Sequence, residues 1–166
     1  MLVERNLRTL ILGLGDRTQG NEGIGARLAR TLVSSFDDAE VRPASDFAGF
    51  AEILDDYDLV IVLKALSYCG RVGTVALGSP YSLENGWGKT PAHAEAFAKE
   101  VSYARLMGHT LPRIEVINIC VGSEDWPERG PSPTVASMYR GIVGRVRDLV
   151  KQVIREAKHP PDPFGR

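Results

Sequence analysis

The sequence predicts an α/β fold, a single domain in which a mainly parallel central sheet lies between two layers of helices as a three-layer α/β/α sandwich. Three short runs of apolar and β-branched residues are typical of parallel strands covered on both faces: Leu10–Leu14, Leu59–Leu63 and Ile114–Val121. Segments with helical periodicity alternate with these runs. With 166 residues, 43% of them hydrophobic, the chain can fill one complete core.

Composition excludes several classes of protein. A formal net charge of −1 provides no basic surface for nucleic acid, so we expect no nucleic-acid partner. No apolar run approaches the roughly 20 residues that cross a bilayer, and charged residues interrupt the start of the chain before a signal-peptide core can form. We therefore expect a cytoplasmic protein without membrane insertion. Cys69 and Cys120 fit no metal-binding spacing and are expected to be small apolar core residues, not a disulfide.

The first predicted strand leads through a glycine-rich loop into a helix that ends near Leu32. Asn21 is the expected N-cap of that helix, which places Glu22 in its first turn. In an open α/β sheet, the loop that leaves a central strand faces the ligand crevice, so Glu22 is a candidate functional residue. A first-turn carboxylate that only stabilises the helix dipole is an equally good interpretation. Nucleotide binding is a minor alternative, because the glycine spacing does not match G-x-G-x-x-G and the P-loop lysine is absent.

The middle of the chain contains shorter elements and one long loop. We expect a strand over Glu40–Pro43 at an edge of the sheet, because Pro43 cannot donate to a strand ladder. A short helical piece over Phe50–Leu54 follows, and then a strand over Arg71–Leu77. Residues Gly78–Pro91 read as a loop whose length suggests a lid or a partner-binding surface.

Two helices are predicted in the second half. The apolar spacing starts one at or just after His93 and ends it near Met107, while a longer amphipathic helix covers Val135–Ala157. A lone histidine such as His93 is more often structural than a ligand. We expect the domain to span residues 1–158, followed by a proline-rich frayed tail over residues 159–166.

Lys64 directly follows the strand Leu59–Leu63. Right-handed crossovers bring the carboxyl ends of the parallel strands to one edge of the sheet, so Lys64 and Glu22 are predicted to share that edge. Lys64 is either a solvated strand-end residue or an internal cation paired with Glu22, since lysine is rarely buried without a partner.

Together these segments resemble the maturation endopeptidases of nickel–iron hydrogenases. Members of that family begin with a strand, a Gly-x-Gly-Asn loop and an Asp-Glu-x-Ile-Gly segment that opens a helix. They also have a Ser-Pro-His segment ahead of a helix and a Gly-x-x-Pro-Thr-Val segment that opens the last helix. The corresponding segments of this chain are Gly13–Asp16, Asn21–Gly25, Thr90–His93 and Gly130–Val135.

The resemblance implies a peptidase that clips the C-terminal extension of a nickel–iron hydrogenase large-subunit precursor after nickel insertion. It implies no tightly bound cofactor, because the nickel is carried by the substrate as a recognition element. The implied protein ligands of that nickel are Glu22 and His93. The family's third ligand is an aspartate, but this chain has Lys64 there, and an ammonium has no lone pair to give. Asp16 and Asp46 are possible supplementary ligands.

Two main hypotheses follow. In the first, the chain is still a peptidase. Its catalytic residues are left unassigned, because the sequence contains no nucleophile motif. The attacking group would then be a water activated by a metal ion or assisted by a carboxylate. In the second, it is a non-catalytic member in which Lys64 replaces the aspartate, and it binds a hydrogenase-like large subunit as a chaperone or checkpoint. The sequence specifies neither the partner subunit, nor the cleavage site, nor the oligomeric state.

Overall fold

The computed structural model describes residues 6–16, 20–78, 91–122 and 128–162. The elements, in chain order, are β1 (Thr9–Leu14), the 3-10 helix η1 (Gly20–Gly23), α1 (Ile24–Leu32), β2 (Ala39–Ala44), α2 (Phe50–Leu54), β3 (Leu59–Ser67), β4 (Val75–Gly78), α3 (Ala92–Leu106), β5 (Arg113–Gly122) and α4 (Pro133–Lys158).

The described strands form one five-stranded sheet in the order β2-β1-β3-β5-β4. β1 pairs in parallel with β2 and β3, and β3 pairs in parallel with β5, whereas β4 runs antiparallel to β5 at the far edge. The mainly parallel sheet is therefore confirmed. The edge position of the strand that contains Pro43 is confirmed as well, because β1 is the sole partner of β2 among the described strands.

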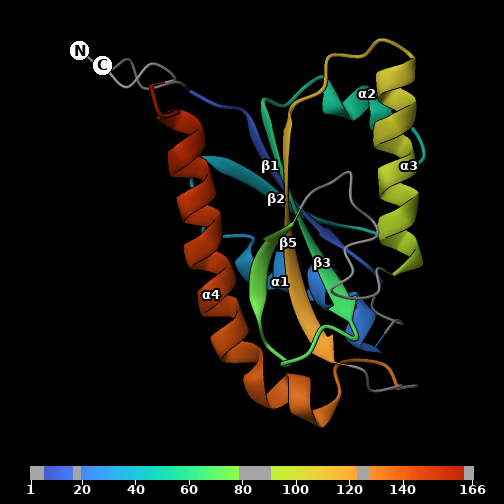
Figure 1. Cartoon of the computed structure of the whole chain (residues 1–166), viewed down its shortest axis with the longest axis vertical. Helices are drawn as coiled ribbons and strands as arrows, with labels where there is room; N and C mark the ends of the chain where they lie inside the picture. The colour runs from blue at the N-terminus through green and yellow to red at the C-terminus, as the bar shows by residue number, and fades with distance from the viewer. Residues whose placement is uncertain (1–5, 17–19, 79–90, 123–127, 163–166) are drawn as a thin grey trace.

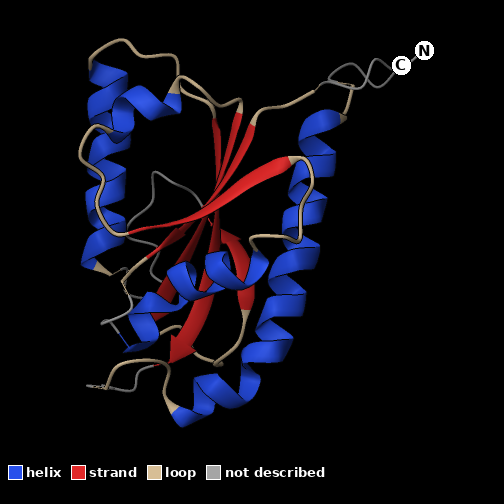
Figure 2. Cartoon of the chain, turned by 180° about the vertical axis from the view of Figure 1, so that it is seen from behind, coloured by secondary structure: helices blue, strands red, loops and turns tan. Residues whose placement is uncertain are grey.

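Helices cover both faces of the sheet. α1 and α4 lie on one face, and α2 and α3 lie on the other (Figures 1 and 2). Along β3, alternate side chains follow this division: Ile61 and Leu63 pack with α1 and α4, whereas Val60 and Val62 pack with α2 and α3. This alternation is the period-2 geometry of a strand buried on both faces. The three-layer α/β/α sandwich is confirmed.

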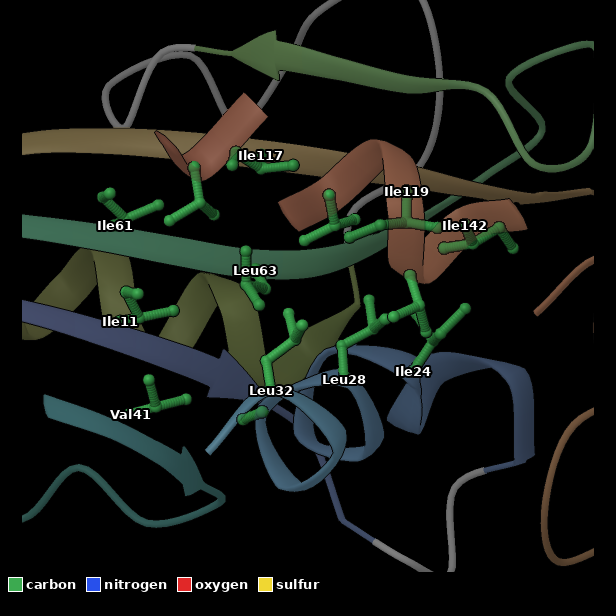
Figure 3. Close-up of a cluster of buried hydrophobic side chains, with 14 of the residues drawn as sticks. Ile11, Ile24, Leu28, Leu32, Val41, Ile61, Leu63, Ile117, Ile119 and Ile142 are labelled. Carbon is green, nitrogen blue, oxygen red and sulfur yellow. The ribbon is translucent and has the colours of Figure 1, made fainter. Parts of the chain in front are cut away.

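The larger of the two main apolar clusters lies between the sheet and the α1–α4 layer. Figure 3 shows isoleucines and leucines from β1, β3 and β5 meeting Leu28 and Leu32 of α1 and Ile142 of α4, and these side chains are fully buried. On the other face, Phe47, Phe50 and Phe97 pack edge to face, with ring centroids 5.4 to 6.0 Å apart.

Two glycines let α1 approach the sheet at backbone distance. A Cβ atom at Gly25 would stand 2.3 Å from the carbonyl oxygen of Leu63 and 2.6 Å from that of Leu14. A Cβ atom at Gly13 would stand 2.1 Å from the carbonyl oxygen of Gly25. The spacing of these glycines therefore serves close helix–strand packing.

The expected cap of α1 is wrong. Asn21 lies inside η1, and Gly23 precedes α1 without a side-chain cap. The buried Asn21 side chain instead binds Ser132: the Ser132 N–H donates to Asn21 Oδ1 at 2.7 Å, and Asn21 Nδ2 donates to Ser132 Oγ at 3.2 Å. Ser132 Oγ in turn accepts from the N–H of Val135 and caps α4. Asn21 thus connects the starts of two helices that lie far apart in sequence.

The cysteines are buried core residues, as expected, but the expectation that they form no disulfide is wrong. Cys69 and Cys120 form a disulfide with a Cα–Cα distance of 5.8 Å. They are 51 residues apart in sequence, so no local pattern indicates the pairing. The bond connects the segment after β3 to β5, next to the buried Leu66. A loop of this length, closed by a disulfide, contributes about 2–4 kcal/mol to stability.

The remaining boundaries differ only in part from the expected ones. The strand expected over Arg71–Leu77 is shorter and begins later, at Val75, because the chain turns at Gly73, which has a φ of 85°. Most of the loop expected over Gly78–Pro91 lies outside the described residues. No helix in the described part of the chain is both long enough and apolar enough to pass through a bilayer.

The contact between α1 and the sheet gives a stability prediction. We expect Gly25→Ala to lower the free energy of unfolding by roughly 1–3 kcal/mol or more, because the added methyl group meets backbone atoms that cannot move aside. Gly144→Ala in α4 is the matched control: a Cβ atom there meets nothing within 4 Å, so a gain of about 0.5–1 kcal/mol is expected. Urea unfolding followed by circular dichroism measures both, and equal stability of Gly25→Ala and the parent would contradict the packing argument.

Candidate functional site

The candidate residues gather at the carboxyl edge, which we define as the edge of the sheet where the parallel strands β1, β2, β3 and β5 end. Glu22 lies in η1, after the end of β1, and Lys64 lies near the end of β3. His93 is the second residue of α3, and α3 begins at the end of the sheet toward which the parallel strands point (Figure 1). The four loops that follow β1, β2, β3 and β5 therefore all start at this edge.

Glu22 is held beside the end of β3 by the backbone around it. The close contact of Gly25 with the carbonyl oxygen of Leu63 fixes the start of α1 against β3, one residue before Lys64. Asn21, next to Glu22, is anchored on Ser132. The Glu22 carboxylate itself is exposed to solvent. Its backbone is therefore fixed while its side chain is accessible to a ligand.

Lys64 is buried. Its side chain is 8% exposed and lies, by the alternation of β3, on the face that carries Val60, Val62 and the α3 layer. Burial favours the neutral amine and lowers the pKa of Lys64 from 10.5 to about 8. At neutral pH the group is still mostly an ammonium, so the edge contains a desolvated positive charge. The prediction that Lys64 is a buried residue, and not a solvated one at the strand end, is confirmed.

The contact expected between Lys64 and Glu22 is not formed. Both residues belong to the described part of the chain, and no ion pair within 4.0 Å joins their side chains. The reason is geometric, since the Lys64 side chain enters the buried α3 side of the sheet whereas Glu22 stays in solvent. This prediction was wrong.

Asn118 is a further polar residue of the site, and sequence reasoning missed it. It is the register partner of Lys64 across the parallel β3–β5 pair and is 2% exposed. Its Oδ1 accepts no hydrogen bond within the described part of the chain. The signal was present, because an asparagine interrupts the apolar run Ile114–Val121. A buried amide oxygen without a donor is costly and uncommon, which makes it a marker of function.

The supplementary carboxylates lie at the same edge but in solvent. Asp16 follows β1 and is exposed. Asp46 lies two residues beyond β2, is exposed, and its Oδ1 accepts a hydrogen bond from the N–H of Ala48 at 3.0 Å. The N–H of Gly15 donates to the carbonyl of Ala44, which ties the ends of β1 and β2 together. Of His93, the structure describes the backbone, and the position of its side chain stays a prediction.

The described side chains at this edge do not form a three-ligand metal centre. Among the side chains that the structure describes, no three histidine, cysteine, aspartate or glutamate residues are close enough to hold a metal ion. Both cysteines are oxidised to the disulfide, and the ammonium of Lys64 repels a divalent cation. The chemistry of the site is that of a fixed positive charge beside a hydrogen-bonding amide.

The loop after β3 adds local strain to this edge. Tyr68 has a φ of 55° and is 65% exposed, and its N–H donates to the carbonyl of Gly122. The next residue, Cys69, forms the disulfide with β5. A non-glycine residue in the left-handed region persists only where neighbouring contacts enforce it, and such residues cluster at functional sites.

Comparison with known proteins finds a relative that is named for hydrogenase expression and formation. The chain is 24% identical to the hydrogenase expression/formation protein HupD of Rhizobium leguminosarum bv. viciae over 155 residues, which cover 89% of this chain and 74% of that protein. No protein-family model matches the chain.

Solved structures of hydrogenase maturation proteases share the fold. The maturating endopeptidase HybD of Escherichia coli superimposes with a TM-score of 0.64 at 19% identity, covering 88% of this chain and 93% of that one. The [NiFe] hydrogenase maturation protease HybD of Thermococcus kodakarensis superimposes with a TM-score of 0.66 at 18% identity, and the match covers 86% of this chain and 98% of that one. At these identities, the superpositions establish the fold.

The burial of Lys64 gives a pH-dependent stability prediction. Because the folded pKa lies below 10.5, the unfolded chain binds more protons than the folded chain between about pH 8 and pH 10.5. The penalty for burying the ammonium is therefore complete below pH 8 and disappears as the pH rises through this window. Lys64→Met should stabilise the protein by on the order of 1–3 kcal/mol at pH 7, and this gain should vanish near pH 10.5.

Denaturant unfolding at pH 7, 9 and 10.5 measures the difference between Lys64→Met and the parent. Lys99→Met is the matched control, since Lys99 lies on the exposed side of α3 and should change stability by less than about 0.5 kcal/mol at every pH. A Lys64→Met variant that is less stable than the parent at pH 7 would show that the buried ammonium is net stabilising.

Proposed function

We propose that the chain is a divergent member of the nickel–iron hydrogenase maturation endopeptidase family and that it processes the C-terminus of a hydrogenase large-subunit precursor. In this proposal the precursor has already received its nickel, which is part of the substrate. The protein works in the cytoplasm, where the precursor is assembled.

The observation that carries the proposal is the arrangement of backbone at the carboxyl edge. The Asn21–Gly25 segment, which carries Glu22, lies against the end of β3, and α3, which carries His93, begins toward the same end of the sheet (Figure 1). The likeness to HupD extends over 89% of the chain, and the fold matches the maturation proteases over a similar share. A local motif match would not extend so far.

Within this proposal, the residues of the chain have separate tasks. Glu22 is exposed and backbone-fixed, which suits a carboxylate that meets a cation brought by the substrate. His93, at the start of α3, supplies an imidazole at the same edge. Lys64 is excluded as a metal ligand while it is protonated, so the chain provides fewer ligands than its relatives' pattern implies. Glu22 or Asp16 can accept the proton of an attacking water.

A second candidate function rests on the same lysine. If Lys64 prevents a productive complex with nickel, the chain still has the fold of the maturation proteases. It would then bind a hydrogenase-like large subunit without cutting it, as a chaperone or a checkpoint. The burial of the ammonium at the implied ligand position is the specific observation that favours this alternative.

Cleavage of a precursor separates the two candidates. Purified protein is incubated with a nickel-loaded large-subunit precursor, and the mass of its C-terminus is followed by mass spectrometry. The peptidase proposal predicts loss of the extension, with Glu22→Gln and His93→Ala lowering the rate at least about 100-fold. Glu52→Gln, on the exposed side of α2, is the control and should leave the rate unchanged. A stable complex that never releases the extension would instead support the chaperone candidate.

Metal affinity tests the role of Lys64 independently of cleavage. We expect the parent protein to bind nickel weakly in calorimetric titration, because an ammonium occupies the place of a ligand. Lys64→Asp should bind at least about tenfold more tightly, since it replaces a repelling cation with a donor oxygen. Lys99→Asp is the matched control for the added negative charge. Tight binding by the parent that Lys64→Asp does not change would refute this role for Lys64.

A further inference from the structure

The segment that connects β3 to β4 crosses β5 near its carboxyl end. β5 lies between β3 and β4 in the sheet, so residues 68–74, which we call the crossing segment, pass over it at the carboxyl edge (Figure 1). The disulfide between Cys69 and Cys120 joins this segment to β5. Cys120 follows Asn118, the register partner of Lys64, by two residues. The disulfide therefore joins the crossing segment to the strand pair that carries Lys64.

The second half of the crossing segment is held without the help of the disulfide. The N–H of Gly73 donates to the carbonyl of Cys120 at 2.8 Å, and the N–H of Cys120 donates to the carbonyl of Thr74 at 2.9 Å. The guanidinium of Arg145 in α4 also donates to the carbonyl of Gly73, at 3.0 Å. These hydrogen bonds hold residues 71–74 on β5 and α4 in either oxidation state of the sulfur atoms.

The first half depends more strongly on the disulfide. Residues 68–70 are joined to β5 by the bond between Cys69 and Cys120 and by a hydrogen bond of 3.1 Å from the N–H of Tyr68 to the carbonyl of Gly122. Tyr68 has a φ of 55° and is 65% exposed. A non-glycine residue keeps a left-handed conformation only where neighbouring contacts enforce it. The disulfide at the next residue is one of the contacts that do so.

The fold can also accommodate the reduced pair. Cys69 and Cys120 are 6% and 0% exposed and pack with Leu66 in an apolar cluster, where thiols behave as small apolar groups. Cys69 Sγ lies 3.0 Å from the carbonyl oxygen of Leu66. A disulfide sulfur has no hydrogen to donate, so this contact becomes a hydrogen bond only on reduction. Each oxidation state therefore has a satisfied local arrangement.

We propose that Cys69 and Cys120 form a reversible redox switch, in which the disulfide fixes the start of the crossing segment on β5 and reduction releases it. Thiol pools keep cytoplasmic proteins reduced, and disulfides that form there are usually transient, catalytic or redox-sensing. The reduced form is then the active one, and oxidation inhibits by stiffening the edge where a partner binds. The choice of active form rests on the proposed function, whereas the switch itself rests on the disulfide and its surroundings.

Thiol–disulfide exchange with two molecules of a cellular thiol carries out the reduction. The first thiolate attacks Sγ of Cys69, the less buried sulfur, and Cys120 leaves as a thiolate that takes up a proton. The second thiolate attacks the mixed disulfide at the sulfur of the first, and Cys69 leaves and is protonated. The two thiols supply two electrons and two protons and become one disulfide. Oxidation is the reverse reaction, with that disulfide as the electron acceptor.

Equilibration with glutathione tests the switch on the intact protein. The protein is incubated at pH 7 in mixtures of reduced and oxidised glutathione, free thiols are blocked with N-ethylmaleimide, and mass spectrometry counts the blocked thiols. We expect more than about half of the molecules to have two free thiols in excess reduced glutathione, and the disulfide to return in excess oxidised glutathione. Circular dichroism should show a folded protein in both. A disulfide that resists reduced glutathione, or a chain that unfolds on reduction, would overturn the proposal.

Amide hydrogen exchange, followed by NMR, identifies the part of the chain that reduction releases. The N–H of Tyr68 should exchange at least about tenfold faster in the reduced protein, because Cys69 no longer holds it beside β5. The N–H groups of Gly73 and Cys120 are internal controls and should change less than about threefold, because their hydrogen bonds persist. Unchanged exchange at Tyr68 would overturn the proposal. So would equal acceleration at all three sites, because the disulfide would then only support the whole fold.

Cleavage assays connect the switch to the proposed function. After removal of glutathione, the oxidised protein should cleave the nickel-loaded precursor at least about threefold more slowly than the reduced protein. The double variant Cys69→Ser/Cys120→Ala is the control: the serine keeps a donor for the carbonyl of Leu66, and the alanine keeps the core apolar. It should cleave like the reduced protein after either pretreatment.

The outcomes distinguish this inference from the proposed function. Equal cleavage rates of the oxidised and reduced protein would overturn the regulatory role of the disulfide and leave the peptidase in place. A precursor that neither form cleaves would refute the peptidase, and the glutathione equilibrium and the exchange of Tyr68 would then decide the switch without it. The comparison of the two oxidation states needs no variant, so a double variant that fails to fold does not remove the test.

Discussion

The backbone contact between α1 and the two central strands is the constraint on which the rest of the structure depends. The carbonyl oxygens of Leu63 and Leu14 lie where a side chain at Gly25 would have to be, so helix and sheet touch without intervening atoms. Such close approach is possible only with glycine. It fixes the start of α1 on the end of β3, and thereby fixes the distance between the Glu22 segment and the strand that bears Lys64. The glycine-rich start of the chain is explained by packing, and a phosphate-binding role is not needed.

The edge of the sheet that this contact positions contains a buried positive charge at Lys64. The resemblance implies a carboxylate at the end of β3, but the chain has an ammonium there, 8% exposed and with a pKa lowered by burial to about 8. A buried cation costs desolvation energy and is retained where neighbouring groups or function compensate it. Asn118, directly across the strand pair, has an unsatisfied amide oxygen. The two observations belong together, because each departs from the apolar composition of the surrounding strands at the same level of the sheet.

The disulfide gives the carboxyl edge a second support. It joins the segment after β3 to β5 two residues beyond Asn118, and the strained backbone of Tyr68 precedes it. The anchoring of Asn21 on Ser132 supports the opposite side of the edge, where η1 meets the start of α4. The residues of the candidate site are thus placed by contacts between segments that are distant in sequence, as expected for a site on loops held by a rigid scaffold.

The sequence by itself determined the α/β class, the central strands, the long last helix and the edge of the sheet near which the backbone of Glu22 and Lys64 lies. These features follow from local periodicity and from the handedness of crossovers, which act over short stretches of chain. Only the tertiary structure decided that Cys69 bonds Cys120, that Asn21 binds Ser132 instead of capping α1, and that Lys64 lies opposite Asn118 in the β3–β5 register. Each of these pairings joins residues that are dozens of positions apart. The physical reason is that strand register and the face on which a side chain is buried select such partners, and neither is encoded in the residues next to them.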